Sequence, residues 1–458
     1  MENLAIGDIL RATRGRQVKG NANFAVADIS TDSRTLKVGD LFVALSGEKF
    51  DGHDFIPQAL SRGASGVVVS KDVGELPIDN IILVEDTMQA LGDIAGAYRS
   101  MFNIPLIGLT GSNGKTTTKD MTALVLSQKY NVLKSEGNFN NFIGVPLMLF
   151  RLSRAHEIAV IEMGTGAPGE MARLVEIAQP DVGVVTNVSA THLEFLGSID
   201  GVAAEKGVLA RAASSGVLNA DDPRVAKMRD GMNGKTILYG LADTGSTNVL
   251  GVDVAQDRDG RPEFTLVTAS GKARIHLQSL GRHNIYNSLA AASVGILFGV
   301  ELDDIKKALE SYSGTCMRMQ KVTVNGVTII DDTYNSNPLS LRAAVDFLLS
   351  VESDGKRIAV IGDMLELGEL SDKLHREAGR FIADSSIDEL VTVGDKAAKA
   401  AEAALEAGMI EDKVCICETN EQASTRLREI LSEGDMALIK GSRGMKMEEI
   451  IRSLSTKQ

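Results

Sequence analysis

Short apolar runs alternate with amphipathic stretches along most of the chain, most regularly after residue 314. There the pattern predicts strands at 327–331, 357–361, 390–393, 414–416 and 436–440, with helices at 339–351, 373–384, 396–406, 421–431 and 446–454. Continuous apolar strands separated by helices indicate a parallel sheet that is covered on both faces. The C-terminal block, residues 314–458, is therefore predicted to be a doubly wound sheet of the Rossmann type. No G-x-G-x-x-G pattern opens this block, so a dinucleotide site is not indicated.

Two earlier blocks show the same rhythm. The central block, residues 101–313, has strand candidates at 104–109, 158–163 and 182–186 and helical stretches at 116–130, 169–179 and 284–299, which favour a second parallel sheet. The N-terminal block, residues 1–100, has strand candidates at 41–45, 66–70 and 80–84 and helices at 54–63 and 86–102, which favour a small α/β unit. Since 458 residues are too many for one core, the predicted fold class is α/β with three domains.

A glycine-rich loop follows the first strand candidate of the central block. Residues 110–117 read T-G-S-N-G-K-T-T and open the next helix. Gly111 and Gly114 let backbone N–H groups converge on an anion at the positive end of that helix. Lys115 adds a charge for the outer phosphates, and the hydroxyl of Thr116 can bind Mg²⁺. The loop predicts a nucleoside triphosphate site in a P-loop ATPase sheet, and an ordinary strand-to-helix turn is the alternative.

Composition and charge exclude some classes of function. The formal net charge of −13 argues against a nucleic-acid partner, because nucleic-acid binders are usually basic. Cys316, Cys415 and Cys417 lack the spacing of metal ligands, and their odd number argues against a disulfide framework, so we expect buried thiols. The start of the chain does not resemble a signal peptide, and no apolar run approaches the roughly 18 residues of a membrane span. These features favour a cytoplasmic enzyme.

Several polar residues follow predicted strands of the central block. Glu162 ends a strand in the sheet of the phosphate loop, where a Mg²⁺ ligand is expected, although a surface strand end is the alternative. His192 follows the next strand. It either lies near the ligand crevice at the ends of these strands or has only a structural role. Asn138, Asn140 and Asn141 form a cluster that suits either a plain loop or a binding site for a phosphate or carboxylate.

Further candidates come later in the chain. Asn284 and Asn287 open an Ala-rich helix, where they could read a base edge or Asn284 could cap the helix. The pair 331–332 could bond ribose hydroxyls or cap the next helix. Lys440 and Arg443 follow the last strand and suit a carboxylate ligand, with a basic surface loop as the competing reading.

These motifs, in this order, resemble the Mur ligases, the ATP-dependent amide ligases that build the peptidoglycan stem peptide. The resemblance is greatest to the member that adds D-alanyl-D-alanine. The segments that carry it are S-T-D-S-R at 30–34, F-V-A-L-S-G-E-K-F-D-G-H-D-F at 42–55, the loop at 110–117, E-G-N-F-N-N-F-I-G-V-P-L at 136–147, E-M-G at 162–164, H-L-E at 192–194, G-R-H-N at 281–284, D-D-T-Y-N-S-N-P at 331–338 and K-G-S-R-G-M-K-M-E at 440–448.

The resemblance implies a role for each of the three domains: the first binds a UDP-sugar peptide, the second binds ATP, and the third closes over the site. It implies ATP contacts at Gly111, Ser112, Asn113, Gly114, Lys115, Thr116, Thr117, Asn284, Asn287, Arg318 and Asp332. It implies two Mg²⁺ ions with ligands at Thr116, Glu162, His192 and Lys206, and catalytic roles for Lys115, His192 and Lys206. Immediately before the arginine that corresponds to Arg318, the family usually has glycine, where the present chain has Met317.

In this resemblance Lys206 is carbamylated, whereas the residues alone indicate an ordinary lysine on a helix surface. Substrate contacts are implied at Asp32, Ser33, Arg34 and His53 for the uridine nucleotide, at Lys440 and Arg443 for the incoming dipeptide, and at Asn138, Asn140, Asn141, Asn335 and Asn337.

The implied reaction belongs to peptidoglycan precursor synthesis. It joins the carboxylate of UDP-N-acetylmuramoyl-tripeptide to the amine of D-alanyl-D-alanine through an acyl phosphate, while ATP gives ADP and phosphate. The enzyme is expected to act as a monomer. Two rivals stay open: another ligase of the superfamily, such as a folylpolyglutamate synthetase or the diaminopimelate-adding enzyme, and a nucleotide-gated switch that makes no bond. A Rossmann dehydrogenase would leave Lys115 unexplained.

Overall fold

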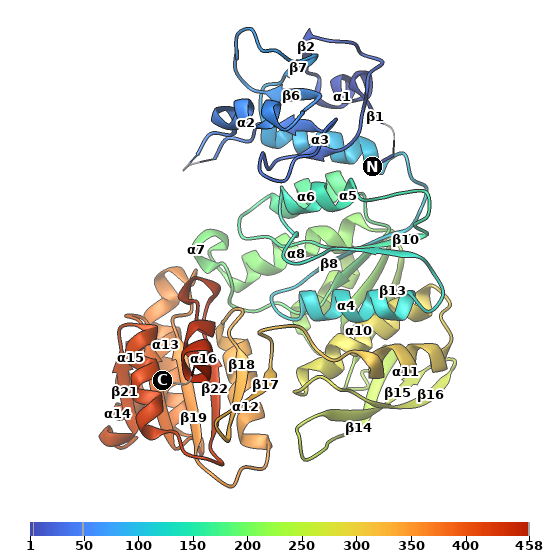
Figure 1. Ribbon diagram of the computed structural model, residues 1–458. Helices are drawn as coiled ribbons and strands as arrows, with labels where there is room; N and C mark the ends of the chain where they lie inside the picture. Colours follow the sequence, from blue (N-terminus) through green and yellow to red (C-terminus); the bar gives the residue numbers. More distant parts are fainter. Residues whose placement is uncertain (3, 48–49, 457–458) are drawn as a thin grey trace.

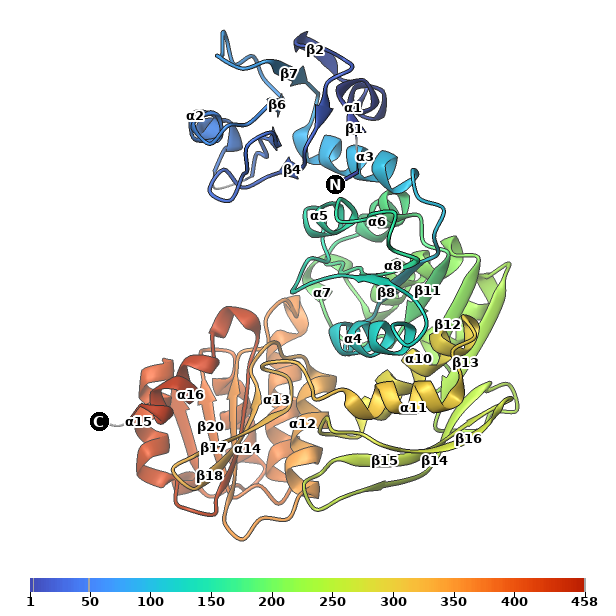
Figure 2. The ribbon, with the colours of Figure 1, turned by 45° about the vertical axis from the view of Figure 1, so that its right-hand side comes forward.

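Three α/β blocks follow one another in the computed structural model, which describes residues 1–2, 4–47 and 50–456 (Figure 1, Figure 2). The N-terminal block lies at the top of Figure 1, the central block below it, and the C-terminal block at the lower left. The predicted three-domain α/β class is confirmed, while the exact block boundaries stay predictions. Residues 48–49 of the motif at 42–55 lie outside the described residues. Within the described part, no helix is both long and apolar enough to span a membrane.

The strands of the N-terminal block are β1 (Leu4–Ala5), β2 (Arg16–Lys19), β3 (Ala25–Val26), β4 (Ile29–Ser30), β5 (Leu41–Val43), β6 (Gly66–Val69) and β7 (Asn80–Leu83). Its helices are α1 (Ile6–Thr13), η1 (Gly52–Phe55), α2 (Ile56–Ser61) and α3 (Thr87–Arg99). Five of the strands form a sheet in the order β2-β7-β6-β5-β4, and β1 pairs with β3. Within the sheet β2 pairs antiparallel with β7, and the other neighbours pair in parallel.

The strands of the central block are β8 (Leu106–Thr110), β9 (Val132–Lys134), β10 (Ile158–Glu162), β11 (Val182–Val185), β12 (Ser215–Asn219), β13 (Lys235–Gly240), β14 (Val249–Gln256), β15 (Pro262–Thr268) and β16 (Gly271–His276). Its helices are α4 (Lys115–Leu126), α5 (Gly144–Leu149), α6 (Glu170–Ala178), α7 (Leu193–Leu196), α8 (Ile199–Ala212), α9 (Pro223–Lys227), η2 (Met228–Gly231), α10 (His283–Leu297) and α11 (Leu302–Ser311). The strands form one sheet in the order β16-β15-β14-β13-β12-β11-β8-β10-β9.

The central sheet is not wholly parallel, which corrects the prediction for this block. The strands from β9 to β14 pair in parallel, whereas β15 is antiparallel to both β14 and β16. The burial of β15 alternates along 262–268, as expected of a strand with one face on the core and the other in solvent. The sequence prediction used only continuous apolar runs, so it missed this alternating segment.

The strands of the C-terminal block are β17 (Gln320–Val324), β18 (Val327–Asp332), β19 (Arg357–Gly362), β20 (Glu389–Val393), β21 (Val414–Cys417) and β22 (Met436–Lys440). Its helices are α12 (Pro338–Ser350), η3 (Gly368–Leu370), α13 (Ser371–Ala383), α14 (Ala398–Glu406), η4 (Glu411–Lys413), α15 (Asn420–Ile430), η5 (Arg443–Met445) and α16 (Glu448–Ser455). The sheet order is β17-β18-β22-β19-β20-β21, with β17 antiparallel at one edge. Apolar side chains of α12 to α14 pack on one face and those of α15 and α16 on the other, which confirms the doubly wound prediction.

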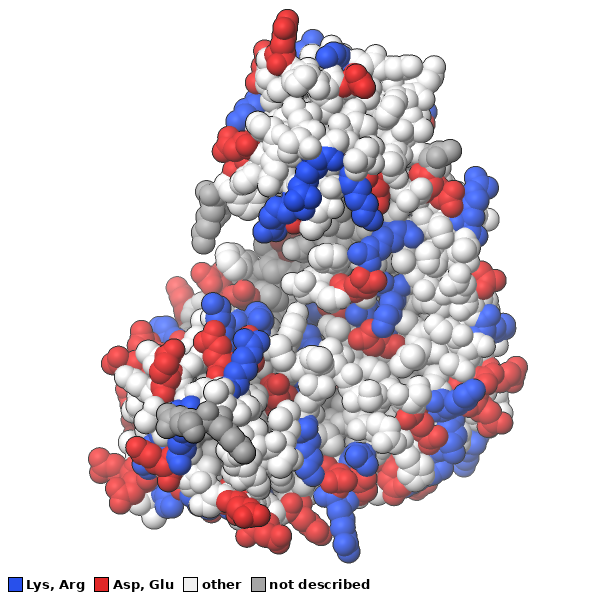
Figure 3. All heavy atoms as spheres, in the orientation of Figure 1, with Lys and Arg blue, Asp and Glu red and all other residues white. Residues whose placement is uncertain are grey.

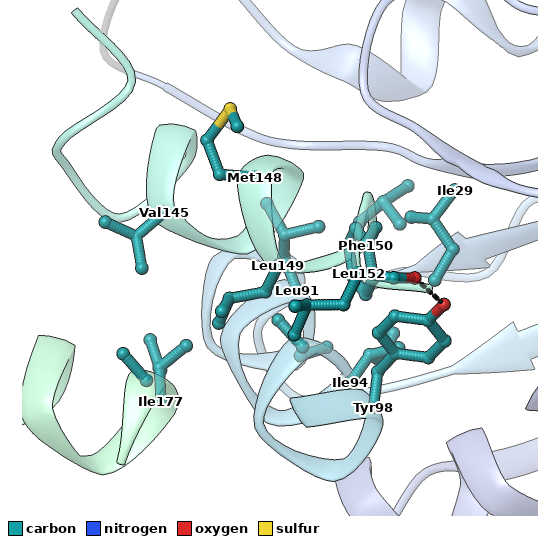
Figure 4. Close-up of a cluster of buried hydrophobic side chains, with 14 of the residues drawn as sticks. Ile29, Leu91, Ile94, Tyr98, Val145, Met148, Leu149, Phe150, Leu152 and Ile177 are labelled. Atoms are coloured by element: carbon teal, nitrogen blue, oxygen red, sulfur yellow. Dashed lines mark hydrogen bonds between the residues drawn. The ribbon is translucent and has the colours of Figure 1, made fainter. Parts of the chain in front are cut away.

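The N-terminal and central blocks share one apolar core. Helices α3, α5 and α6 pack against one another, and their buried side chains join those of the central strands (Figure 4). Tyr98 is fully buried there, and its hydroxyl donates to the carbonyl of Leu152 at 2.7 Å. On the opposite face of the central sheet, α4, α10 and α11 enclose a second core. We call the contact of α3 with α5 and α6 the apolar junction.

The expectation of buried thiols is wrong for one cysteine. Cys417 is buried and Cys415 is partly buried, but Cys316 is exposed in the segment between α11 and β17. That segment connects two blocks over the surface, where backbone polar groups can reach water.

Candidate active site

The predicted strand, loop and helix of the phosphate cradle are present. β8 ends at Thr110, and α4 begins immediately after Gly114. A Cβ atom at Gly111 would lie 1.8 Å from the Thr186 hydroxyl oxygen, so no other residue fits this close approach. The loop is fixed to the segment after β11, because Ser112 N donates to the carbonyl of Asn187 at 2.9 Å. The backbone geometry therefore supports an anion cradle rather than an ordinary turn.

Lys115 is folded back onto this loop. Its ammonium donates to the carbonyl of Gly111 at 2.7 Å. Burial lowers the pKa of Lys115 from its ordinary value, whereas the nearby Glu162 carboxylate raises it and the Arg318 guanidinium lowers it. A cation that is held by one carbonyl and partly desolvated is suited to bind a phosphate oxygen in exchange.

One cavity of about 1140 Å³ joins the phosphate loop to the C-terminal block. Sixteen of the predicted site residues line it: Ser112, Asn113, Gly114, Lys115, Thr116, Thr117, Asn140, Asn141, Glu162, His192, Asn287, Arg318, Asp332, Asn335, Asn337 and Lys440. The lining thus comes from the carboxyl ends of two sheets, which is where open α/β sheets bind ligands.

Glu162 is 2% exposed, and it lines this cavity. Its Oε1 accepts a hydrogen bond from the side-chain amide of Asn140 at 2.8 Å. Its other oxygen, Oε2, is buried and has no hydrogen-bond partner among the described residues. A buried carboxylate oxygen without a donor is costly unless a cation binds there, so this residue fits the predicted metal role.

The metal site is sparse in protein ligands. Within the described residues, no three His, Cys, Asp or Glu side chains gather closely enough to hold an ion by themselves. Mg²⁺ is usually held by one or two carboxylates together with water and substrate phosphates. The Glu162 carboxylate, the Thr116 hydroxyl and the His192 ring line the same cavity, and an ion bound by any of them would need phosphate oxygens or water to complete its ligands.

Of the three clustered asparagines, two face the cavity. Asn140 holds Glu162, and the side-chain oxygen of Asn141 accepts from Gly144 N at 2.9 Å at the start of α5. Asn138 is exposed and is not part of the cavity lining. The cluster therefore combines both readings of the sequence, with Asn141 in a turn and Asn140 beside a carboxylate.

Lys206 is buried, which corrects the reading of an ordinary surface lysine. It is 1% exposed and lies in α8. Burial and, to a smaller extent, the charge of Lys115 lower its pKa to about 7, while Glu205 opposes the shift. Sequence periodicity missed this position because α8 has many small residues and no clear polar face. Lys206 does not line the cavity itself.

Two residues of the C-terminal block reach the phosphate loop. Arg318 donates to the hydroxyl of Thr116 at 3.1 Å, and its guanidinium stacks over the Tyr334 ring at 3.9 Å. The side-chain amide of Asn337 donates to Oδ1 of Asn113 at 2.7 Å. Asn337 also caps α12 by accepting from Ser340 N. We call these contacts, with the His192 contact described next, the polar junction.

His192 joins the same junction. It precedes α7 and its Nδ1 lies 2.5 Å from a carboxylate oxygen of Glu366, in the loop after β19. The His192 ring lowers the pKa of Glu366 by hydrogen bonding. Sequence reasoning missed Glu366, although it follows a parallel strand by a few residues and the strand-end rule used for Glu162 could have found it.

Asp332 and Lys440, which were predicted to contact different ligands, pair with each other. The ammonium of Lys440 lies 2.5 Å from a carboxylate oxygen of Asp332 and donates to the carbonyl of Asn335 at 2.9 Å. Lys440 is 2% exposed, so the reading of a basic surface loop is wrong for it. Arg443 is exposed, pairs with Glu448 at 3.0 Å, and is not part of the cavity lining.

Asn284 and Asn287 form one buried network instead of a helix cap. The side-chain amide of Asn284 donates to the carbonyl of Leu280 at 2.7 Å, and that of Asn287 donates to Oδ1 of Asn284 at 2.8 Å. Asn287 faces the cavity, whereas Asn284 supports it from behind. The residue before the first turn of α10 is Arg282, and the pair 331–332 does not cap α12 either.

The predicted uridine-site residues lie in the N-terminal block, away from this cavity. Asp32 pairs with Arg34 at 2.9 Å, and these hydrogen bonds lower the pKa of Asp32. The hydroxyl of Ser33 donates to Gln58 at 2.7 Å. His53 is buried, with Nδ1 lying 2.5 Å from an oxygen of Asp51 and Nε2 accepting from Ser70 N at 3.0 Å. Both nitrogens of His53 are thus bound within the block.

Comparison with known proteins gives one consistent result. Three family models match in order: the Mur ligase family catalytic domain at 25–99, the Mur ligase middle domain at 109–295, and the Mur ligase glutamate ligase domain at 317–443. The UDP-N-acetylmuramoyl-tripeptide--D-alanyl-D-alanine ligase of Bacillus subtilis is 39% identical over 432 residues, which cover 93% of this chain and 92% of that protein.

Solved structures agree with the sequence comparison. A crystal structure of MurF from Acinetobacter baumannii superposes with a TM-score of 0.91 at 32% identity, covering 100% of both chains. The MurF ligase from Thermotoga maritima, solved in complex with ADP, has a TM-score of 0.82 at 28% identity and covers 93% of this chain and 97% of that one.

Proposed function

The chain belongs to the Mur ligase family, and we infer from its site and its relatives that it is an ATP-dependent amide ligase of peptidoglycan precursor synthesis. It joins D-alanyl-D-alanine to UDP-N-acetylmuramoyl-tripeptide. One observation carries this inference: a phosphate loop with Lys115 shares a single cavity with the buried Glu162, whose Oε2 has no partner among the described residues. Its action as a monomer in the cytoplasm stays a prediction.

The chemistry explains why the site needs these groups. A carboxylate is a poor acylating agent, so the tripeptide carboxylate must first attack the γ-phosphorus of ATP. The bond to the leaving ADP oxygen breaks, and an acyl phosphate results. Two unit charges about 4 Å apart repel by roughly 4 kcal/mol at an effective dielectric of 20, so this approach requires local positive charge. The amine of the dipeptide then attacks the acyl carbon, loses a proton and displaces phosphate.

The residues on both sides of the cavity supply that charge. Lys115 would exchange the Gly111 carbonyl for a phosphate oxygen, and Arg318 lies beside it through its bond to Thr116. Because these cations come from different blocks, closing the polar junction assembles them and excludes water, which would hydrolyse the acyl phosphate.

We propose that Thr116, Glu162 and His192 hold Mg²⁺, with two ions in the complete site. When bound, Mg²⁺ neutralises the phosphate charge and orients the transferred group. The unpartnered Glu162 oxygen supports this assignment most directly.

We further propose that Lys206 is carbamylated. Only a neutral amine attacks CO₂, and the pKa of about 7 makes a large fraction of Lys206 neutral near neutral pH. The neutral amine forms an N–C bond to CO₂ and releases one proton, so a side chain next to Lys115 that would otherwise be neutral or cationic becomes an anion. That change would relieve the repulsion between the two lysines and create a carboxylate ligand for the second ion.

The charge distribution on the N-terminal block supports the proposal that this block binds the UDP-sugar peptide. In Figure 3, Lys and Arg side chains gather at the lower edge of this block, beside the hollow that separates it from the rest of the molecule on this face. The net charge of −13 therefore coexists with a local basic surface that suits an anionic nucleotide.

Phosphate release tests the function. Wild-type protein with ATP, Mg²⁺ and UDP-N-acetylmuramoyl-tripeptide should release phosphate rapidly with D-alanyl-D-alanine, but not with D-glutamate or diaminopimelate. Lys115→Ala should abolish release, and Lys227→Ala, an exposed lysine of α9, should retain it. Release that is indifferent to the amine would favour a nucleotide switch instead, and release with another amine would favour a related ligase.

The carbamate has a separate test. With ¹³C-bicarbonate, wild-type protein should show a carbamate carbon signal that is missing in Lys206→Ala and present in Lys227→Ala. Short carboxylates should partly restore the activity of Lys206→Ala. A wild-type spectrum without this signal, under conditions of full activity, would exclude the carbamate.

A further inference from the structure

The contact between Glu366 and His192 crosses the polar junction. Oε2 of Glu366 lies 2.5 Å from Nδ1 of His192, with side-chain exposures of 50% and 30%. A polar contact this exposed adds at most about 1 kcal/mol to stability. Its significance therefore depends on what it does to the orientation of the imidazole, which lines the cavity while Glu366 does not.

The loop that carries Glu366 is seated against α7. The carbonyl of Glu366 accepts a hydrogen bond from Glu194 N at 3.3 Å. At Gly368 a Cβ atom would lie 3.1 Å from Cα of Glu194, so the two backbones are in direct contact. Leu374 of α13 packs against the cluster that includes Leu193 and Leu196. The Glu366 side chain is thus placed by its own backbone and by packing, not by a flexible surface encounter.

Both partners have unusual backbone conformations. Glu366 has φ of 62° and His192 has φ of 53°, in the left-handed region that costs a residue with a Cβ roughly 1 kcal/mol or more. Two such residues facing each other across two blocks indicate that the fold maintains this pairing against a local cost.

We propose that Glu366 is a positioning residue for His192. Its carboxylate accepts a hydrogen bond from Nδ1–H, which fixes the ring and leaves the Nε2 lone pair as the one available to a ligand in the cavity. Histidines that bind metal ions commonly donate their second ring N–H to a carboxylate in this way, and loss of that partner weakens metal binding about 10–100-fold. The inference rests on the proposed function, in which His192 holds a divalent cation.

The pairing also couples the cation to the polar junction. Glu366 belongs to the C-terminal block and His192 to the central block, so the ring is held only when the two blocks are together. By linkage, a cation that binds the held ring more tightly favours the closed junction by the same factor.

The test compares Glu366→Ala, Glu366→Gln and the control Glu369→Ala, an exposed residue of the adjacent η3. Mn²⁺ binding with ADP present is measured by electron paramagnetic resonance, and the His192 tautomer is read from ¹⁵N-histidine NMR without metal. Glu366→Ala should bind Mn²⁺ about 10–100-fold more weakly and lose the Nδ1–H tautomer. Glu366→Gln, which keeps an acceptor oxygen, should lie between Glu366→Ala and wild type, and Glu369→Ala should match wild type.

Wild-type Mn²⁺ affinity together with an unchanged tautomer in Glu366→Ala would overturn the proposal, provided that thermal unfolding shows this variant to be folded. His192→Ala distinguishes a failure of the metal role of His192 from a failure of the positioning role of Glu366. If it leaves Mn²⁺ affinity unchanged, the metal role in the proposed function fails, while the metal-free NMR spectrum still decides whether Glu366 orients the ring.

Discussion

The two junctions of this molecule differ in their contacts: one is formed by apolar packing and the other by hydrogen bonds and charged side chains. At the apolar junction, α3 of the N-terminal block packs on α5 and α6 through buried aliphatic and aromatic side chains (Figure 4). At the polar junction, the central and C-terminal blocks meet through Arg318–Thr116, Asn337–Asn113 and Glu366–His192, around a cavity of about 1140 Å³.

This difference indicates which junction can open. Separating the apolar junction would expose apolar surface to water, at a free-energy cost of about 25 cal/mol per Å², and new contacts with water do not offset this cost. Each polar contact can be exchanged for water at a net cost of only about 1 kcal/mol. We therefore expect the N-terminal and central blocks to move as one body, and the C-terminal block to open for nucleotide and close for chemistry.

The largest effect is expected from the apolar junction. Leu149 of α5 is fully buried, and Leu149→Ala removes contacts with α3, so it should lower the free energy of unfolding by about 2–5 kcal/mol. Urea unfolding followed by circular dichroism measures this change. Leu370→Ala, at a leucine that is 42% exposed, is the control and should change little. A cost below about 1 kcal/mol for Leu149→Ala would show that this junction is loose.

At the polar junction, Arg318→Ala should damage binding more than stability. The variant loses a charged hydrogen bond to Thr116 and a cation beside the phosphates, worth about 1.5–3 kcal/mol, so the KM for ATP should rise about 10–100-fold. Steady-state kinetics measures it. Arg342→Ala is the matched control, since Arg342 also stacks on an aromatic ring, Phe381, at 4.4 Å but lies outside the cavity. Equal effects of the two variants would contradict the assignment.

A smaller effect isolates one contact of the polar junction. Asn337→Ser keeps a capping oxygen for α12 but cannot reach Asn113, so the closed population should fall about two- to tenfold. Small-angle X-ray scattering with an ATP analogue measures the population. In the double variant with Asn113→Ala, the second substitution should add little, whereas additive shifts would mean that these two side chains act independently.

The smallest effect is expected at Met317. Its φ of 62° lies in the left-handed region, which glycine adopts at little cost. Met317→Gly should therefore change the free energy of unfolding by no more than about 1 kcal/mol, in the stabilising direction. Thermal unfolding measures it, and a clear loss of stability would show that the Met317 side chain, near Arg443, contributes more than its backbone costs.

Sequence patterns predicted the parallel strands, the helices and the phosphate loop because each depends on local periodicity or on glycines at a fixed spacing. They failed where tertiary contact decides. The burial of Lys206 depends on the helices and strands of the central block that pack around α8, and the pairing of Asp332 with Lys440 depends on β18 lying beside β22. The strand-end rule could have marked Glu366 as a candidate, but its contact with His192 of another block has no signal in the spacing along the chain.

Isotope transfer tests most directly whether ATP is used to activate an acid. The tripeptide carboxylate is labelled with ¹⁸O, and the phosphate released during ligation to D-alanyl-D-alanine is analysed by mass spectrometry. An acyl phosphate predicts that each phosphate carries one oxygen from the labelled carboxylate. Unlabelled phosphate would mean that water attacks the nucleotide, and the ligase account would be contradicted.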